Sequence, residues 1–184
     1  MRIGFGTDTH AFAALDDDTF VQNLGCLGFK MPVKILANSD GDVVVHSIID
    51  ALLSGARSIN AEMNQLPPTI GGFFDEEDYC AEAMLSGITE MNINPELTGE
   101  PMLKKVLKAI SDKAIKSKTD YKIENVTISI VSNFPKIMPR LHEMEKKLSS
   151  IIGAPVTVSA TTTDGIGEIG RGQGINTTAV VLFN

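Results

Sequence analysis

Three side chains near the start of the chain have the types and the spacing of a metal-ligand set. Asp8 and His10 stand two residues apart at the end of MRIGFGTDTH, and a β-strand places two such side chains on one face. His46 follows in the segment NSDGDVVVH. One carboxylate and two imidazoles are donors that catalytic zinc uses, with a fourth position left open. The alternative interpretation is an ordinary polar strand end.

Two predicted elements would position this set. A strand over residues 2–8 carries Asp8, and a helix over about residues 40–57 carries His46, because its apolar residues recur at helical spacing. Ser39 is the predicted N-cap of this helix, its hydroxyl accepting from the backbone N–H of Asp42. Asp50 lies one turn after His46, so it is a candidate acceptor for the imidazole N–H. An ordinary polar residue near the helix surface is the alternative for Asp50.

The rest of the chain mixes strand and helix patterns. The β-branched run ENVTISIVS predicts a strand over residues 124–132. Further strands are expected at residues 20–28, 31–36, 156–163 and 176–183, helices at 77–90, 100–116 and 140–152, and loops at 11–19, 58–68, 92–98 and 133–139. This order predicts an α+β fold, a two-layer α/β sandwich in which helices cover one face of a mixed sheet.

Composition limits the classes of partner. The 184 residues are 43% hydrophobic, which suits a single domain over residues 1–184. A net charge of −7 without a basic cluster argues against nucleic acid, and a phosphate ligand would need metal ions beside so acidic a protein. No apolar run is long enough for a membrane span or a signal peptide. Cys26 and Cys80 lack metal spacing and suggest reduced thiols, so we expect a cytoplasmic protein, or one processed in a plastid-type organelle.

Four segments together resemble a known family. They are MRIGFGTDTHAF, SDGDVVVHSIIDALLSGA, FPKIMP and VTVSATTTDGIGEIGRGQGI. In this order they are similar to the 2-C-methyl-D-erythritol 2,4-cyclodiphosphate synthases of the non-mevalonate isoprenoid pathway. The resemblance runs almost end to end and leaves out mainly residues 60–68 and about 79–101, which we interpret as insertions.

The resemblance implies a cyclisation that depends on zinc and on Mg²⁺ or Mn²⁺. The 2-phosphate of 4-diphosphocytidyl-2-C-methyl-D-erythritol 2-phosphate attacks the β-phosphorus of the same molecule and expels CMP. Because both reacting groups belong to one molecule, the enzyme mainly folds the substrate and neutralises its charge. The family also implies a homotrimer with sites between subunits.

The resemblance further implies a role for individual residues. Asp8, His10 and His46 match zinc ligands, the first two also lying at the substrate, and Asp164 matches a ligand of the second divalent ion. Asn38 and Thr162 match the two positions credited with transition-state stabilisation. The remaining matches are to substrate-binding residues: Ser39, the diphosphate loop with Ile70 and Gly71, the cytidine loop with Asn133, Phe134, Pro135, Lys136, Ile137 and Met138, the threonines Thr161 and Thr163, and Arg171.

The chain departs from the family pattern at four places. Asn38 stands where the family usually has His, and an amide cannot carry the charge of an imidazolium. Asp164 replaces Glu as the second metal ligand, and Glu168 replaces an aromatic residue. The usual Gly-Asp-Ile-Gly reads Pro68-Thr69-Ile70-Gly71, with Phe74-Asp75-Glu76 after it. These departures motivate an alternative function, a metabolite-binding homologue without turnover that serves a regulatory or scaffold role.

Other motifs give weaker support for a function. The sequence Gly165-Ile-Gly-Glu-Ile-Gly170 is a literal G-x-G-x-x-G, but a strand pattern follows it where a dinucleotide-binding unit needs a helix. His142 is expected at the surface of a helix. No G-x-S-x-G elbow supports a serine hydrolase. A zinc hydrolase acting on phosphate esters stays open on the metal residues alone.

Overall fold

The computed structural model describes residues 1–14, 20–37, 39–74 and 95–184. The predicted residues Asn38, Asp75, Glu76 and Cys80 and the predicted helix over 77–90 lie outside this part of the chain. In chain order the elements are β1 (Arg2–Ala14), β2 (Val21–Leu24), β3 (Leu27–Lys30), β4 (Val33–Ile35), α1 (Val43–Arg57), α2 (Ile70–Phe73), α4 (Gly99–Lys116), β5 (Ile123–Ser132), α5 (Leu141–Ile152), β6 (Val156–Thr161), α6 (Gly167–Gly170) and β7 (Gly174–Phe183), with 3₁₀ turns at Met63–Gln65, Pro95–Leu97 and Met138–Arg140.

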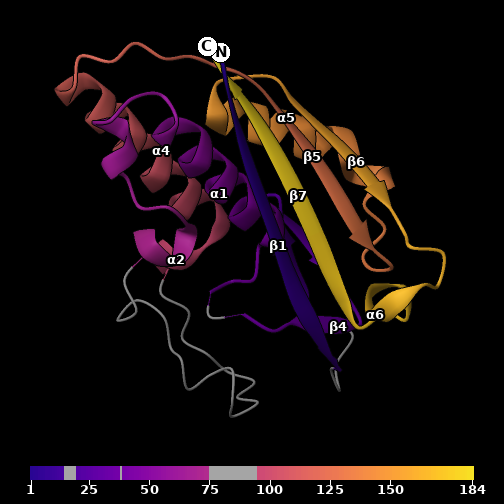
Figure 1. Ribbon diagram of the computed structural model, residues 1–184. Helices are drawn as coiled ribbons and strands as arrows, with labels where there is room; N and C mark the ends of the chain where they lie inside the picture. The colour runs from indigo at the N-terminus through magenta and orange to yellow at the C-terminus, as the bar shows by residue number, and fades with distance from the viewer. Residues whose placement is uncertain (15–19, 38, 75–94) are drawn as a thin grey trace.

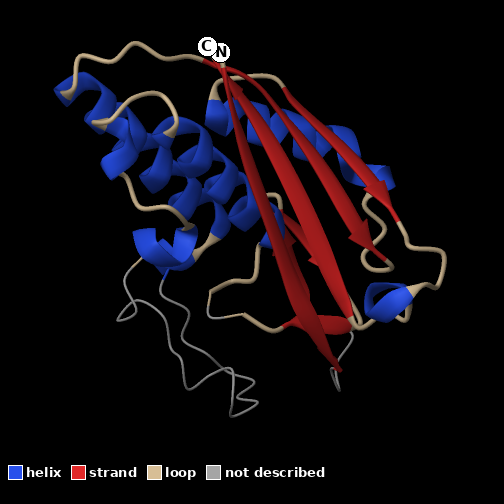
Figure 2. Ribbon diagram, in the orientation of Figure 1, coloured by secondary structure: helices blue, strands red, loops and turns tan. Residues whose placement is uncertain are grey.

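A five-stranded mixed sheet forms the framework, in the order β4-β1-β7-β5-β6. The strand β7 pairs antiparallel with both β1 and β5, whereas β5 and β6 run parallel. The helices α1, α4 and α5 lie on the same side of this sheet (Figures 1 and 2). The predicted α+β class with a mixed sheet is therefore confirmed.

The core lies between the sheet and these helices. Alternate residues of β7 are fully buried, from Ile175 through Ala179 to Phe183. Helix α1 packs against β1 and β7, and α4 packs against α1. The approach of α1 to β1 requires glycine in the strand, because a Cβ on Gly4 would lie 1.9 Å from the backbone oxygen of Ala51 and one on Gly6 2.2 Å from that of Ser47. The two strand glycines thus set the spacing between strand and helix.

Two predicted secondary-structure elements in the first third of the chain were wrong. Residues 11–14 continue β1 instead of forming a loop, because Phe12 and Ala13 pair with Ile35 and Lys34 of β4. The expected strand over residues 20–28 is a hairpin, since Gly25 and Cys26 both take positive φ values, 58° and 61°, between β2 and β3. Two consecutive positive φ values suit the tight turn of a two-residue hairpin.

The other predicted elements match closely. The strand expected at 124–132 is β5, and the last predicted strand is β7 with two more residues at its start. The helices expected at 100–116 and 140–152 begin at Gly99 and Leu141. The strand expected at 156–163 ends at Thr161, and a single helical turn begins at Ile70. None of the helices among the described residues is long and apolar enough to cross a membrane.

Candidate metal centre and substrate pocket

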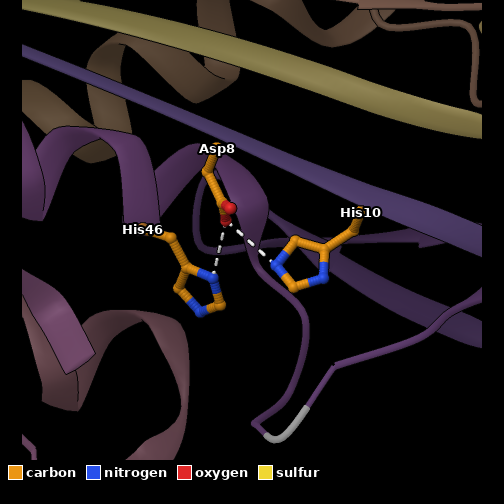
Figure 3. Close-up of side chains that lie close together, drawn as sticks. All are labelled: Asp8, His10 and His46. Carbon is orange, nitrogen blue, oxygen red and sulfur yellow. Dashed lines mark hydrogen bonds and ion pairs between the residues drawn. The ribbon is translucent and has the colours of Figure 1, made fainter. Parts of the chain in front are cut away.

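Asp8, His10 and His46 converge on one point, as predicted. Oδ2 of Asp8 lies 3.0 Å from Nε2 of His10 and 3.0 Å from Nδ1 of His46 (Figure 3). Among the described residues they are the group of three His, Cys, Asp or Glu side chains whose ligand atoms all lie within 4.8 Å of one another. Strand β1 contributes two ligands and α1 the third, so the close packing of these two elements builds the group.

Hydrogen bonds and charge attraction hold Asp8 and the two histidines together without a metal. Burial alone would raise the pKa of Asp8, but hydrogen bonds from His10 and His46 and their charge hold it well below its usual range. Burial alone would lower the pKa of His10, yet the hydrogen bond and charge of Asp8, with the carbonyl of Leu36, raise it above the ordinary value. A metal cation at this point would therefore displace the proton of His10 Nε2 and take over the attraction to the carboxylate.

The donor set fits a metal ion. It offers one carboxylate oxygen and two imidazole nitrogens, which suits zinc with an open fourth position. Each imidazole is also fixed at its other nitrogen, as is usual for metal-ligating histidines. Nδ1 of His10 lies 2.6 Å from the backbone oxygen of Leu36, and Nε2 of His46 lies 3.0 Å from Oγ of Ser39. The residues present could thus hold a metal at this place.

Ser39 is not the N-cap of α1. The helix begins at Val43, and its N-cap is Asp42, whose Oδ1 accepts from the N–H of Val45 at 3.1 Å. Ser39 Oγ instead accepts from the N–H of Gly41 and contacts His46. Gly41 has a positive φ of 71°, and this turn separates Ser39 from the helix. The motif SDGD holds three residues that can cap a helix, so spacing alone did not select the right one.

Asp50 does not accept from His46 either. The described hydrogen bonds of the His46 ring go to Asp8 and Ser39. Oδ1 of Asp50 accepts from the backbone N–H of Ile70 at 2.7 Å. Asp50 therefore ties the predicted diphosphate loop with Ile70 and Gly71 to the helix that carries His46.

A second group of predicted residues surrounds a cavity of about 150 Å³ at the ends of β5 and β6. The loop after β5 and the threonines at the end of β6 meet there, as expected if both contact one ligand. The lining consists of Ile130, Ser132, Pro135, Lys136, Ile137, Met138, Ala160, Thr161 and Thr162. Asn133 supports this loop from behind, since its Nδ2 donates to the backbone oxygen of Gly170 at 2.8 Å. Phe134 contacts Phe12 of β1, with ring centroids 6.4 Å apart.

Of the remaining predicted residues in this region, Asp164 and Arg171 are exposed and Thr163 is half-buried. Asp164 has a φ of 52°, and its Oδ1 accepts from the hydroxyl of Thr162 at 3.2 Å. Thr163 donates to the backbone oxygen of Ile166. Arg171 forms an ion pair with Glu168, so the acid that replaces the family's aromatic residue has a partner within the same loop.

Two motifs that the sequence analysis set aside, His142 and the G-x-G-x-x-G sequence, have the expected structures. His142 is 96% exposed at its side chain and pairs with Glu145 at 2.8 Å. The glycines of the G-x-G-x-x-G sequence form a loop and a single helical turn before β7. This loop has no long helix after it, so it is not a dinucleotide-binding unit.

Sequence reasoning missed three contributors. The carbonyl of Leu36 belongs to the backbone and leaves no mark in the sequence. The capping role of Asp42 was assigned to Ser39, although Asp42 is fully buried and its oxygens also accept from the N–H groups of Gly25 and Cys26, at 2.7 and 2.8 Å. Burial and the charge of Asp40 raise its pKa above the usual range. Ser132 could have been found as the polar end of a predicted strand.

Comparison with known proteins agrees with this geometry. The model of the YgbB family matches residues 1–184. A 2-C-methyl-D-erythritol 2,4-cyclodiphosphate synthase of Marinobacter nauticus is 32% identical over 187 residues, covering 100% of this chain and 97% of its own. The bifunctional enzyme IspD/IspF of Clavibacter michiganensis is 34% identical over 187 residues, and this chain spans 37% of its length.

Solved structures share the fold. A 2C-methyl-D-erythritol-2,4-cyclodiphosphate synthase in its CDP-bound form superposes with a TM-score of 0.70 at 22% identity, covering 100% of both chains. The IspF of Plasmodium falciparum in complex with CDP gives a TM-score of 0.65 at 23% identity, covering 99% of this chain and 94% of its own. The family match over the full chain and the relatives above 30% identity lead to one conclusion: this chain belongs to the YgbB family.

Proposed function

We propose that this protein is a 2-C-methyl-D-erythritol 2,4-cyclodiphosphate synthase, which cyclises 4-diphosphocytidyl-2-C-methyl-D-erythritol 2-phosphate and releases CMP. The observation that carries the proposal is the convergence of Asp8, His10 and His46 within 4.8 Å in a chain whose full-length relatives bear that name. We take zinc as the metal there and Mg²⁺ or Mn²⁺ as the second ion, with Asp164 as its ligand.

The chain's own residues account for binding and orientation. Bound metal ions supply Lewis acids that polarise the phosphate oxygens. The cavity between Lys136 and Thr161 is open to a cytidine-type group, with backbone amides of its loop and the hydroxyl of Thr162 as hydrogen-bond donors. The loop at Ile70 and Gly71, held by Asp50, would receive the diphosphate end. Both phosphate groups would then be held in one geometry, which is the main requirement of an intramolecular displacement.

The separation of the two groups of residues supports a homotrimer with sites between subunits. The metal group lies on β1 and α1, whereas the cavity lies at β5 and β6, and β7 stands between β1 and β5. Three strand spacings amount to about 14 Å. The sheet face away from the helices also exposes apolar side chains: Ile3 is 66%, Phe5 57% and Val180 37% exposed. A second copy packed on this face would cover them and complete a site with its own residues.

The test is the reaction itself. Purified protein with zinc, Mg²⁺ and the cytidylylated substrate should release CMP and form a cyclic diphosphate that ³¹P NMR identifies. An open-chain product phosphorylated at both positions would instead indicate the zinc hydrolase. No CMP above background from zinc-loaded protein would overturn the proposal.

The site assignment has its own test. Asp8→Ala and His46→Ala should each lose bound zinc, since each variant removes one of three ligands, while His142→Ala should retain it. Zinc retained by both ligand variants would show that the metal binds elsewhere.

Asn38 favours a second candidate, a metabolite-binding homologue without turnover. An amide in place of the family's usual imidazole cannot carry positive charge beside a phosphate. Asn38→His distinguishes the candidates. A large gain in rate at unchanged substrate affinity would indicate a crippled catalyst, whereas a robust wild-type rate would eliminate this candidate.

A further inference from the structure

The two histidines of the metal group face it with different nitrogens. His10 points Nε2 at Asp8, and His46 points Nδ1 at the same carboxylate oxygen (Figure 3). The nitrogen on the far side of each ring has a partner from one short segment that follows β4. Leu36 provides its backbone oxygen to His10 at 2.6 Å, and Ser39 provides Oγ to His46 at 3.0 Å.

The partner of His10 determines where that ring keeps its proton, and the partner of His46 allows a proton on its far nitrogen. A backbone carbonyl only accepts, so Nδ1 of His10 must carry a hydrogen. The hydroxyl of Ser39 has two lone pairs; one accepts from the N–H of Gly41 at 3.3 Å, and the other can accept from Nε2–H of His46. With these far nitrogens protonated, the lone pairs available for a metal are those on Nε2 of His10 and Nδ1 of His46.

Ser39 is buried against His46. It is 5% exposed, and its hydroxyl is surrounded by the turn at Gly41 and the ring of His46. The resemblance implies a contact between this serine and substrate, and in the structure the hydroxyl contacts the metal ligand His46.

We propose that Leu36 and Ser39 are positioning residues that hold the two histidines in opposite tautomers, so that His10 binds the metal through Nε2 and His46 through Nδ1. The inference rests on the metal-binding part of the proposed function. Partners of this kind typically change metal affinity by about 10- to 100-fold when they are removed.

Nitrogen NMR of the histidine rings tests the proposal directly. The chain has three histidines, and the exposed His142 serves as a reference. In zinc-loaded wild-type protein labelled with ¹⁵N, we expect His10 to keep its hydrogen on Nδ1 and His46 to keep its hydrogen on Nε2. The same tautomer for both rings would overturn the proposal without the need for any variant.

Zinc affinity, measured by competition with a chelator, gives a second readout. Ser39→Ala should weaken zinc binding by about 10- to 100-fold, and Ser39→Thr, which keeps a hydroxyl, should restore most of it. The matched control is Ser47→Ala, because Ser47 is equally buried beside His46 but donates to the backbone oxygen of Val44. Wild-type affinity in Ser39→Ala would contradict the proposal.

Failure of the tautomer proposal and failure of the proposed cyclase activity give different results. A wild-type protein that binds no zinc contradicts the inference. A zinc-loaded protein with opposite tautomers that releases no CMP contradicts only the proposed cyclase activity.

Discussion

At the scale of single residues, Asp8 and His10 each stabilise the charged form of the other in the metal-free protein. The lowered pKa of Asp8 contributes stability that is present above about pH 4, its unfolded pKa, and is lost as the pH falls further. The raised pKa of His10 contributes stability that is present below about pH 6.5 and is lost as the pH rises through the folded value. The pair therefore stabilises the metal-free fold most between these limits.

Zinc binding should follow the opposite trend above pH 6. Because the metal displaces the proton on Nε2 of His10, zinc affinity should rise with pH between about pH 6 and pH 8. Chelator competition over this range measures the effect, and His142→Ala should leave the profile unchanged because that ring is exposed. An affinity independent of pH would mean that His10 is not a ligand.

The sequence predicted the metal residues but not what surrounds them. Asp8 and His10 could be placed on one face because alternation in a strand is a local rule. The partner of Asp50 is Ile70, twenty residues away along the chain, and only the fold brings these two together. The choice between Ser39 and Asp42 as cap depended on the backbone of Gly41, which residue types alone do not specify.

At the scale of elements, Asp42 joins the start of α1 to the hairpin of β2 and β3. Its buried carboxylate accepts from three backbone N–H groups, those of Gly25, Cys26 and Val45. Asp42→Ala leaves these donors unpaired, so we expect a loss of about 3 kcal/mol in the free energy of unfolding. Urea denaturation measures it.

The control for this prediction is Asp112→Ala. Asp112 lies on α4, where its side chain is 48% exposed and pairs with Lys108. Exposed pairs contribute little, so this variant should unfold close to the wild-type midpoint. Equal losses in the two variants would show that Asp42 has no special role.

The contact between β1 and α1 should be intolerant of a single methyl group. Gly6→Ala would bring a Cβ to 2.2 Å from the backbone oxygen of Ser47, so the helix must move away from the strand. We expect a loss of about 3 kcal/mol and weaker zinc binding, because strand and helix each carry ligands. Calorimetry and chelator competition measure the two effects.

Gly72→Ala is the matched control. A Cβ added to Gly72 would have Cδ of Pro68 as its nearest neighbour, at 3.5 Å, so a methyl group fits there. If Gly6→Ala bound zinc like Gly72→Ala, the close approach of α1 would not position the ligands.

The element boundaries show where prediction from sequence ends. Strand β5 and helix α4 were expected within one residue of their bounds, because β-branched runs and helical periodicity are local signals. The extension of β1 to residue 14 depends on pairing with β4, a contact between segments about twenty residues apart. No local pattern specifies such a pairing.

At the scale of the whole molecule, the open sheet face makes assembly testable. Phe5 is 57% exposed and pairs in register with Val180 on the neighbouring strand. We expect the wild-type protein to have three times the mass of one chain, and Phe5→Asp to dissociate it, because burying an unpaired carboxylate is costly. Light scattering after gel filtration measures the mass.

The same variant should separate zinc binding from CMP release. Phe5→Asp should keep zinc, since all three ligands come from one chain, but lose CMP release if sites lie between subunits. Ile115→Asp is the control, because Ile115 is 74% exposed on α4, on the helical side of the molecule. A monomeric wild-type protein with full activity would contradict the assembly.

The pairing of β1 with β7 has a consequence for the order in which the chain folds. Arg2 pairs with Phe183 and Ala11 with Gly174, so the strand with Asp8 and His10 finds its central neighbour in a segment far along the chain. Contacts this distant in sequence form late and slow the folding reaction. On the ribosome, the three ligands, Asp8, His10 and His46, must therefore wait for β7 to emerge before the complete zinc site can assemble. Metal uptake would then report on the synthesis of β7, and a chain truncated before β7 would lack a stable centre.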